Sequence, residues 1–111
     1  MTKFVYIYHA PMSPADAAPP DPAEMEQVMG AWMAWAGKVG DGMVDFGTPL
    51  DNGVSVTPDG TSPSTREVAG YSIIEAEDMA AALALAKDHP HLKMPGACTI
   101  EVHEALPVPG M

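Results

Sequence analysis

The sequence predicts an α+β fold, the ferredoxin-like split βαβ sandwich, in which two helices cover one face of an antiparallel sheet. Three observations predict it: several segments alternate with a period of two, two segments have helical periodicity, and the order is β-α-β, a turn-rich excursion, then β-α-β. The chain has 111 residues, which fits a single domain over residues 1–111 with residues 105–111 as a tail. Short right-handed crossovers then bring the strands into one sheet.

The first predicted strand, residues 3–9, alternates and is rich in aromatic and β-branched residues. Its two faces are both apolar: Phe4, Tyr6 and Tyr8 lie on one, and Val5 and Ile7 on the other. A strand that is wetted on one side carries one polar face, so this strand is expected to be covered on both sides.

The first helix is predicted over residues 22–39, after a proline-rich loop at residues 10–20. Asp21 is placed to cap it, Pro22 suits its first turn, and Gly40 ends it. Its apolar residues form a stripe that is expected to lie on the core. They are Met25, Val28, Met29, Trp32, Ala36 and Val39, flanked by Met33 and Trp35.

The second half of the chain repeats the strand–helix–strand pattern. Residues 43–48 alternate as a second strand, and residues 49–67 form an excursion with turn residues around a short strand at 54–57. Residues 68–75 are predicted as the next strand, and residues 77–88 as the second helix, which Pro90 stops. Residues 97–104 are the last strand, with Cys98, Ile100 and Val102 facing the helices and Thr99, Glu101 and His103 facing away.

Two helices can cover only one face of this sheet, although the first strand is apolar on both faces. Large exposed apolar faces are rare in soluble monomers, so the sequence predicts a homodimer whose sheets face each other. A monomer is the competing interpretation.

The charge pattern excludes several classes of partner. Fifteen acidic residues against five basic ones give a formal net charge of −10, and the basic residues are scattered. Such a surface repels phosphate, so neither nucleic acid nor a membrane surface is an expected partner. No apolar run approaches the roughly 20 residues of a membrane span. The start of the chain alternates too regularly for a signal peptide, and a single cysteine suits a reducing compartment, so a cytoplasmic location is predicted.

Several short motifs, in order along most of the chain, resemble the YCII-related or DGPF-domain family. They are Tyr6-Ile7-Tyr8-His9, Ala31-Trp32-Met33-Ala34-Trp35, Gly47-Thr48-Pro49, Gly70-Tyr71-Ser72-Ile73-Ile74-Glu75-Ala76, Pro90-His91-Leu92 and Thr99-Ile100-Glu101-Val102. The resemblance implies a dimeric α+β barrel built on the ferredoxin-like unit. It implies no settled activity, although a His–Asp pair near a pocket suggests an enzyme. The chain departs from the namesake motif, because Asp59-Gly60 is followed by Thr61-Ser62-Pro63.

The predicted topology gathers histidines at one end of the sheet. His9, His89 and His91 should lie there with Pro49 and Thr99, and His103 toward the opposite end. A histidine beside a carboxylate provides a general base, and the leading pair is His9 or His91 with Asp45. An aromatic lining would suit an aromatic or otherwise apolar small molecule. The residues expected to form it are Tyr8, Trp32, Trp35 and Tyr71.

Each histidine also has a structural interpretation. His91 can cap the end of the second helix, and His89, next to a proline, can be exposed to solvent. Pro90 between them makes a common inward direction uncertain, so no metal site is predicted, and no cofactor motif is present.

Three functions remain open from the sequence. The first is a cofactor-independent enzyme that moves a proton on a small aromatic or carbonyl compound. The second is a small-molecule binding or sensing module without turnover, and the third is a structural accessory dimer.

Overall fold

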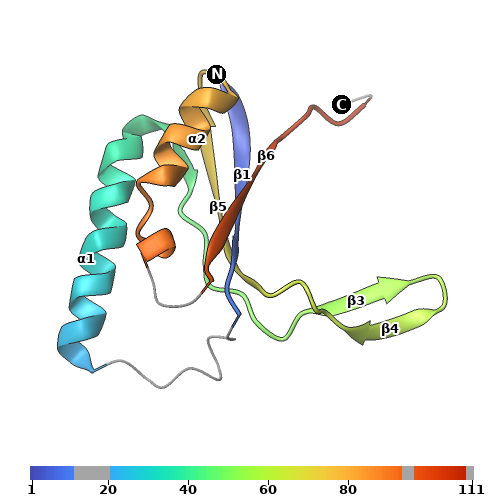
Figure 1. The fold of residues 1–111 in the computed structure, drawn as a ribbon. Coiled ribbons are helices and arrows are strands. Elements are labelled where there is room, and N and C mark those ends of the chain that lie inside the picture. The colour runs from blue at the N-terminus through green and yellow to red at the C-terminus, as the bar shows by residue number, and fades with distance from the viewer. Residues whose placement is uncertain (12–20, 94–96, 110–111) are drawn as a thin grey trace.

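The protein is a small α+β structure with an antiparallel sheet and two helices (Figure 1). The computed structural model describes residues 1–11, 21–93 and 97–109, so most of the predicted loop at residues 10–20 lies outside the described residues. The elements in chain order are β1 (Thr2–His9), α1 (Pro22–Val39), η1 (Gly40–Gly42), β2 (Met43–Asp45), β3 (Val54–Thr57), β4 (Gly60–Pro63), β5 (Val68–Ala76), α2 (Met79–Lys87), η2 (Pro90–Lys93) and β6 (Thr99–Glu104).

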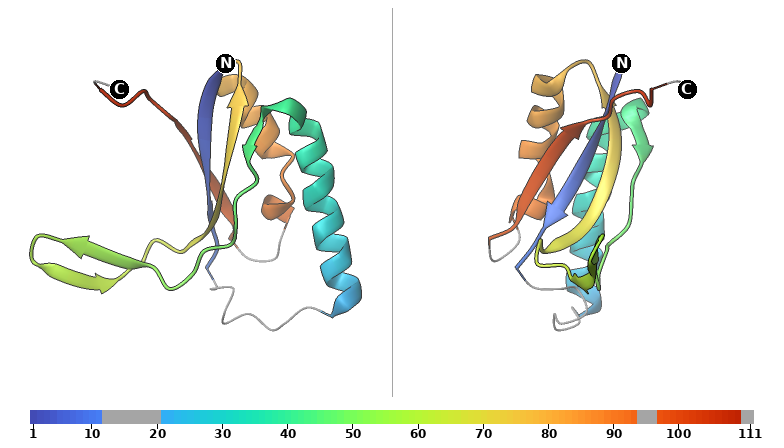
Figure 2. Two further views of the ribbon diagram at one scale, coloured as in Figure 1. Left: turned by 180° about the vertical axis from the view of Figure 1, so that it is seen from behind. Right: turned by 90° about the vertical axis from the view of Figure 1, so that its right-hand side faces the viewer.

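The main sheet has the strand order β2-β5-β1-β6, and every neighbouring pair is antiparallel. This arrangement is consistent with the predicted ferredoxin-like class. The central strand β1 pairs Ile7 with Tyr71 of β5 on one side and with Glu101 of β6 on the other. Both helices lie on one face of the sheet, so the opposite face, here called the open face, has no helix over it (Figure 2).

The core lies between this sheet and the helices. Every second residue of β1 is buried there, namely Phe4, Tyr6 and Tyr8. Trp35 of α1 is also buried, and its Nε1 donates to the carbonyl oxygen of Leu85 in α2 at 2.9 Å. The Tyr6 hydroxyl donates to the carbonyl oxygen of Ala82. The polar tips of these aromatic residues therefore join α2 to the sheet, through Tyr6, and α1 to α2, through Trp35.

Helix α1 has the predicted bounds, but only part of its apolar stripe is buried. The Asp21 side chain accepts from the Glu24 backbone N–H at 2.8 Å, which is the predicted N-cap. Trp32 and Val39 pack against the core, whereas the residues of the first three turns are about half exposed. The expectation that the whole stripe lies on the core is wrong, because the N-terminal half of α1 extends beyond α2 and η2 (Figure 1). The exposed members are Met25, Val28, Met29 and Met33.

Helix α2 begins two residues later than predicted, at Met79. The cause is Asp78, which is the N-cap and accepts from the Ala81 N–H at 2.9 Å. The helix ends at Lys87, and the chain continues through Pro90 into η2. His89 lies between them and is fully buried, so its interpretation as a solvent-exposed residue is wrong.

Strand β2 is shorter than its predicted range of 43–48, since its pairing with β5 covers only Met43–Asp45 and is irregular between these two residues. Gly47 then turns the chain with a φ of 86°. A Cβ at this position would meet the Tyr71 carbonyl oxygen at 1.6 Å, so glycine is required where the chain presses against β5. The sheet contact resumes at a single bridge between Pro49 and Gly70.

The excursion is a two-stranded hairpin, β3–β4, rather than one short strand. It projects from the sheet on the side opposite the helices (Figures 1 and 2). Val54 and Val56 on the hairpin are 60% and 77% exposed. The radius of gyration is 15.4 Å, against about 13 Å for a compact domain of this length, as expected when an arm stands away from the body.

Candidate functional site

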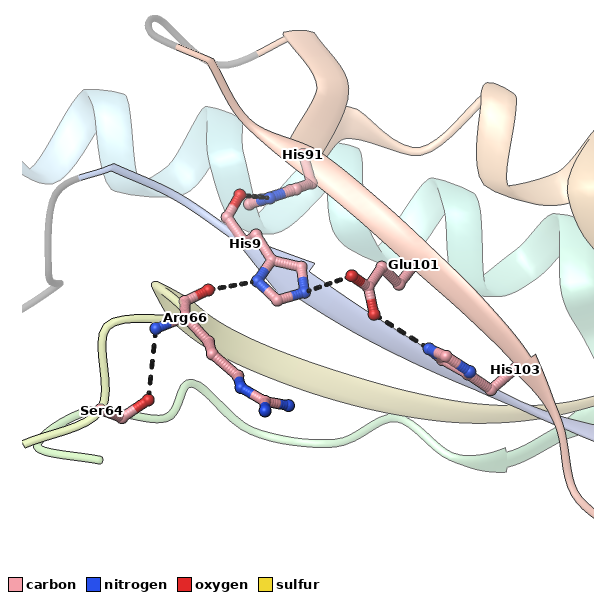
Figure 3. Close-up of polar contacts among 6 residues, drawn as sticks. All are labelled: His9, Ser64, Arg66, His91, Glu101 and His103. Atoms are coloured by element: carbon pink, nitrogen blue, oxygen red, sulfur yellow. Dashed lines mark hydrogen bonds and ion pairs between the residues drawn. The ribbon is translucent and has the colours of Figure 1, made fainter. Parts of the chain in front are cut away.

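His9 ends β1 on the open face, where its ring is held from both sides (Figure 3). Its Nδ1 lies 2.6 Å from the carbonyl oxygen of Arg66, and its Nε2 lies 3.5 Å from Glu101 Oε2. A carbonyl oxygen only accepts, so Nδ1 carries a proton and donates to it. In the neutral ring, Nε2 is therefore the nitrogen with the free lone pair.

The lone pair of Nε2 has no hydrogen-bond partner among the described residues, although this atom is shielded from solvent. It faces a carboxylate oxygen, which is also an acceptor. Two acceptors cannot form a hydrogen bond with each other, so one of these two atoms must first bind a proton. The pair of His9 and Glu101 is therefore arranged to take up a proton and to stabilise the imidazolium that results.

Glu101 is bounded on its other side by His103, whose Nε2 lies 2.9 Å from Glu101 Oε1. The hydrogen bond from His103 holds the pKa of the Glu101 carboxyl below its usual range. The carboxylate is more than half exposed, whereas the His9 side chain is 17% exposed. Glu101 is thus the member of the pair that solvent or a small molecule reaches first.

An open pocket of about 530 Å³ lies over this pair. Its lining combines apolar groups with four ionisable ones and comes from β1, the segment before β5, the first residue of β5, and β6. The lining residues are Ile7, His9, Arg66, Glu67, Val68, Thr99 and Glu101. A pocket of this size accommodates a small organic molecule.

The carboxylate beside His9 is Glu101, and Asp45 lies elsewhere on the open face. Asp45 Oδ2 accepts from the Tyr71 hydroxyl at 3.1 Å, and its Oδ1 accepts from the Gly47 N–H at 2.8 Å. The sheet order explains this placement, because β5 separates β2 from β1, whereas β6 is next to β1. With strands about 4.8 Å apart, Asp45 is two strands from the histidine with which the sequence pairs it.

The predicted aromatic lining is divided between the two faces of the sheet. Tyr71 is half-buried on the open face, one strand from Ile7. Tyr8, Trp32 and Trp35 lie on the helix side, where they surround His89. Successive residues of a strand point to opposite faces, so Tyr8 and His9 cannot line the same pocket.

His91 also lies on the helix side, yet it contacts the site through the backbone. It is buried, and its Nε2 donates to the carbonyl oxygen of His9 at 2.9 Å. His9 is paired with Thr99 in the sheet, and the Pro49 bridge to Gly70 is close by. The predicted gathering at one end of the sheet therefore occurs, but of the three histidines gathered there, His9 alone presents its ring to the open face.

Arg66, Glu101 and His103 are site residues that the sequence reasoning did not include. His103 lies toward the opposite end of the sheet, as predicted, because it pairs with Val5 of β1, but its ring reaches back to Glu101 and so belongs to the same cluster. The available signal was the alternation of the last strand, which places Glu101 and His103 on the open face with His9. Arg66 lies in the turn-rich excursion, where no periodicity indicates the direction of a side chain.

Within residues 1–11, 21–93 and 97–109, no three histidine, cysteine, aspartate or glutamate side chains are grouped so as to hold a metal ion. In these same ranges, no helix is both long and apolar enough to cross a membrane. No protein-family model matches the chain, and the comparison with curated proteins gives no match.

Proposed function

We propose that the protein is a cofactor-independent enzyme that transfers a proton on a small carbonyl compound, with His9 as the general base. The observation that carries the proposal is the state of the His9 ring. Its Nδ1–H is fixed on the Arg66 carbonyl, and its Nε2 faces Glu101 across 3.5 Å without a hydrogen bond. In this proposal Glu101 is the carboxylate partner of His9, the role for which the sequence analysis names Asp45.

The proposed step removes a proton from the carbon next to a carbonyl group. The C–H bond breaks, its electron pair moves to the carbonyl oxygen to form an enolate, and the proton passes to the exposed Glu101 carboxylate and from it to Nε2 of His9. Glu101 stabilises the imidazolium until the proton returns to the enolate, at the same carbon or at another position. A positioned base of this kind typically contributes 10²–10⁴-fold in rate.

We also propose that the active form is a homodimer with the YCII-related type of architecture, in which the open faces of two sheets pack together. The half-buried apolar residues Val5, Ile7 and Ile73 on this face support the proposal. A second sheet over them would close the pocket and exclude water, which strengthens the electrostatic interactions inside it.

The test is proton exchange in deuterated water. A panel of small aliphatic and aromatic aldehydes and ketones is incubated with the protein, and loss of the α-hydrogen signal is followed by NMR. We expect His9→Gln to reduce the exchange rate at least about 100-fold, with circular dichroism checking that the fold is retained.

A matched pair of carboxylate variants decides between the two candidate partners of His9. Glu101→Gln and Asp45→Asn each remove one negative charge from the open face, but only Glu101 lies beside His9. We expect Glu101→Gln to slow exchange about tenfold or more and Asp45→Asn to leave it within twofold. Exchange that survives His9→Gln unchanged would contradict the proposed base.

A further inference from the structure

The pocket over His9 contains one permanent positive charge, the guanidinium of Arg66. The chain has five lysines and arginines, and Arg66 is the one that lines this pocket. Its side chain extends alongside the His9 ring (Figure 3). Two acidic residues, Glu67 and Glu101, share the pocket lining with it.

Within the described part of the chain, this guanidinium has no partner. Arg66 contributes its backbone to the site, because its carbonyl oxygen accepts from His9 and its N–H donates to Ser64 Oγ at 3.3 Å. Among the described residues, the guanidinium forms neither a hydrogen bond nor an ion pair, although carboxylates lie on the same pocket. Its five N–H donors therefore remain available to a ligand.

The backbone next to Arg66 is held in an uncommon conformation. Glu67 has a φ of 57°, in the left-handed region that non-glycine residues rarely adopt. Its carbonyl oxygen accepts from the Ala10 N–H at 2.9 Å, which ties the turn to the end of β1. Strain of this kind persists where the surroundings enforce it, and here it fixes the residue that holds the His9 ring.

We propose that the substrate of the His9 site carries a carboxylate, which Arg66 binds while the His9–Glu101 pair acts on a nearby carbon. The proposal rests on the proposed function for the reacting carbon, but the anion site can be tested by itself. A guanidinium binds a carboxylate through two parallel N–H···O bonds, so it fixes the orientation as well as the charge of the substrate. In a chain of net charge −10, an anion needs such a group in order to enter a pocket that also holds Glu67 and Glu101.

Binding of matched probes tests the anion site without any need for turnover. Benzoate and phenylacetate are titrated into the ¹⁵N-labelled protein, and so are their neutral counterparts, benzamide and phenylacetamide. The backbone amide signals of His9 and Thr99 report binding. We expect the carboxylates to bind at least about tenfold more tightly than the amides.

Three variants separate a specific contact from a change in net charge. We expect Arg66→Gln to weaken carboxylate binding about tenfold and to leave amide binding within twofold. Arg66→Lys keeps the charge without the planar fork, so it should recover only part of the affinity. Lys87→Gln removes the same charge from the exposed end of α2 and should change nothing.

The outcomes distinguish this inference from the proposed function. Carboxylates that do not bind, that bind no better than the amides, or that lose affinity equally in Arg66→Gln and Lys87→Gln would overturn the anion site. Carboxylate binding that depends on Arg66, in a protein that exchanges no α-hydrogen, would support the anion site and contradict the proton transfer.

Discussion

At the scale of single residues, a directed chain of hydrogen bonds runs through the core beneath the site. The backbone N–H of His91 donates to His89 Nδ1 at 3.0 Å, so His89 carries its proton on Nε2. That nitrogen donates to the Tyr8 hydroxyl at 3.0 Å, and Tyr8 donates to Ser72 Oγ at 2.7 Å. Ser72 in turn donates to the carbonyl oxygen of Phe46 at 2.6 Å. Every member of the chain has a fixed role as long as His89 is neutral.

This series of hydrogen bonds makes the stability of the protein sensitive to acid. Burial, and secondarily the charge of His91, lower the pKa of His89 to about 3. A proton on Nδ1 of His89 would also break the hydrogen bond from the His91 backbone N–H, because two donors would then face each other. In the unfolded chain His89 titrates near pH 6.5, so below that pH the unfolded state binds a proton that the folded state does not. The contribution to stability is complete above pH 6.5 and is lost as pH falls toward 3.

We therefore predict that His89→Gln makes stability less dependent on pH. The variant should be destabilised at neutral pH by about 1–3 kcal/mol, because the buried partners of His89 lose their geometry. Between pH 6.5 and about 4, the wild type should lose up to about 1.4 kcal/mol per pH unit more than the variant. Urea unfolding at several pH values measures both slopes. Equal slopes would show that His89 is protonated without cost in the fold.

The same scale shows what the sequence could predict of the site. The position of His9 and its neighbours Pro49 and Thr99 followed from topology alone, because strand ends at one edge of an antiparallel sheet are determined by element order. The partner of His9 did not follow, since it depends on which strand lies next to β1. Glu101 and Asp45 are equivalent as carboxylates, and only the order β2-β5-β1-β6 separates them.

At the scale of elements, the two helices depend on different stabilising interactions. Helix α1 has 18 residues, and those that pack in or against the core, Trp32, Trp35 and Val39, lie in its C-terminal half. Helix α2 has nine residues, fewer than an isolated helix needs to be stable in water. Its first turn is held by the Asp78 carboxylate on the Ala81 N–H.

We predict that the Asp78 cap is worth about 1 kcal/mol to the fold. Asp78→Ala should lower the free energy of unfolding by this amount, whereas Asp78→Ser, which can cap as well, should retain most of it. Glu26→Gln on the exposed surface of α1 removes the same charge and serves as the control. Urea denaturation measures all three. A cost for Glu26→Gln as large as for Asp78→Ala would attribute the effect to net charge instead of to the cap.

The elements also show why periodicity overestimated the core. The stripe on α1 is a property of the sequence, but its burial requires a surface opposite each turn, and the sheet and α2 cover only the C-terminal half. The excursion shows the opposite error, because residues 60–63 have too little strand-like pattern to be predicted as β4. They pair because Pro58 and Asp59 reverse the chain after β3, and Gly60, which begins β4 opposite Thr57, has a φ of 139°.

At the scale of the whole molecule, the open face and the β3–β4 hairpin form a corner. The hairpin leaves the sheet on its open side, so any body that packs on the open face also lies beside the hairpin (Figure 2). An isolated two-stranded hairpin is only marginally stable in water. Its exposed valines, Val54 and Val56, and the half-buried Ile73 of the sheet are thus surfaces that one second copy can cover together.

We predict that the protein sediments with about twice the monomer mass of 11.6 kDa, and that Ile73→Glu makes it a monomer. In a two-fold dimer each substitution acts twice, and like charges brought together in an interface cost several kcal/mol. Leu83→Glu places the same charge on α2, where Leu83 is 41% exposed on the helix side, and should leave the dimer intact. Analytical ultracentrifugation of the three proteins makes the comparison.

Because the second sheet is proposed to close the His9 pocket, the Ile73→Glu monomer should also exchange α-hydrogens more slowly, while Leu83→Glu should not. A wild type that sediments as a monomer yet keeps full exchange activity would show that the pocket works open to solvent.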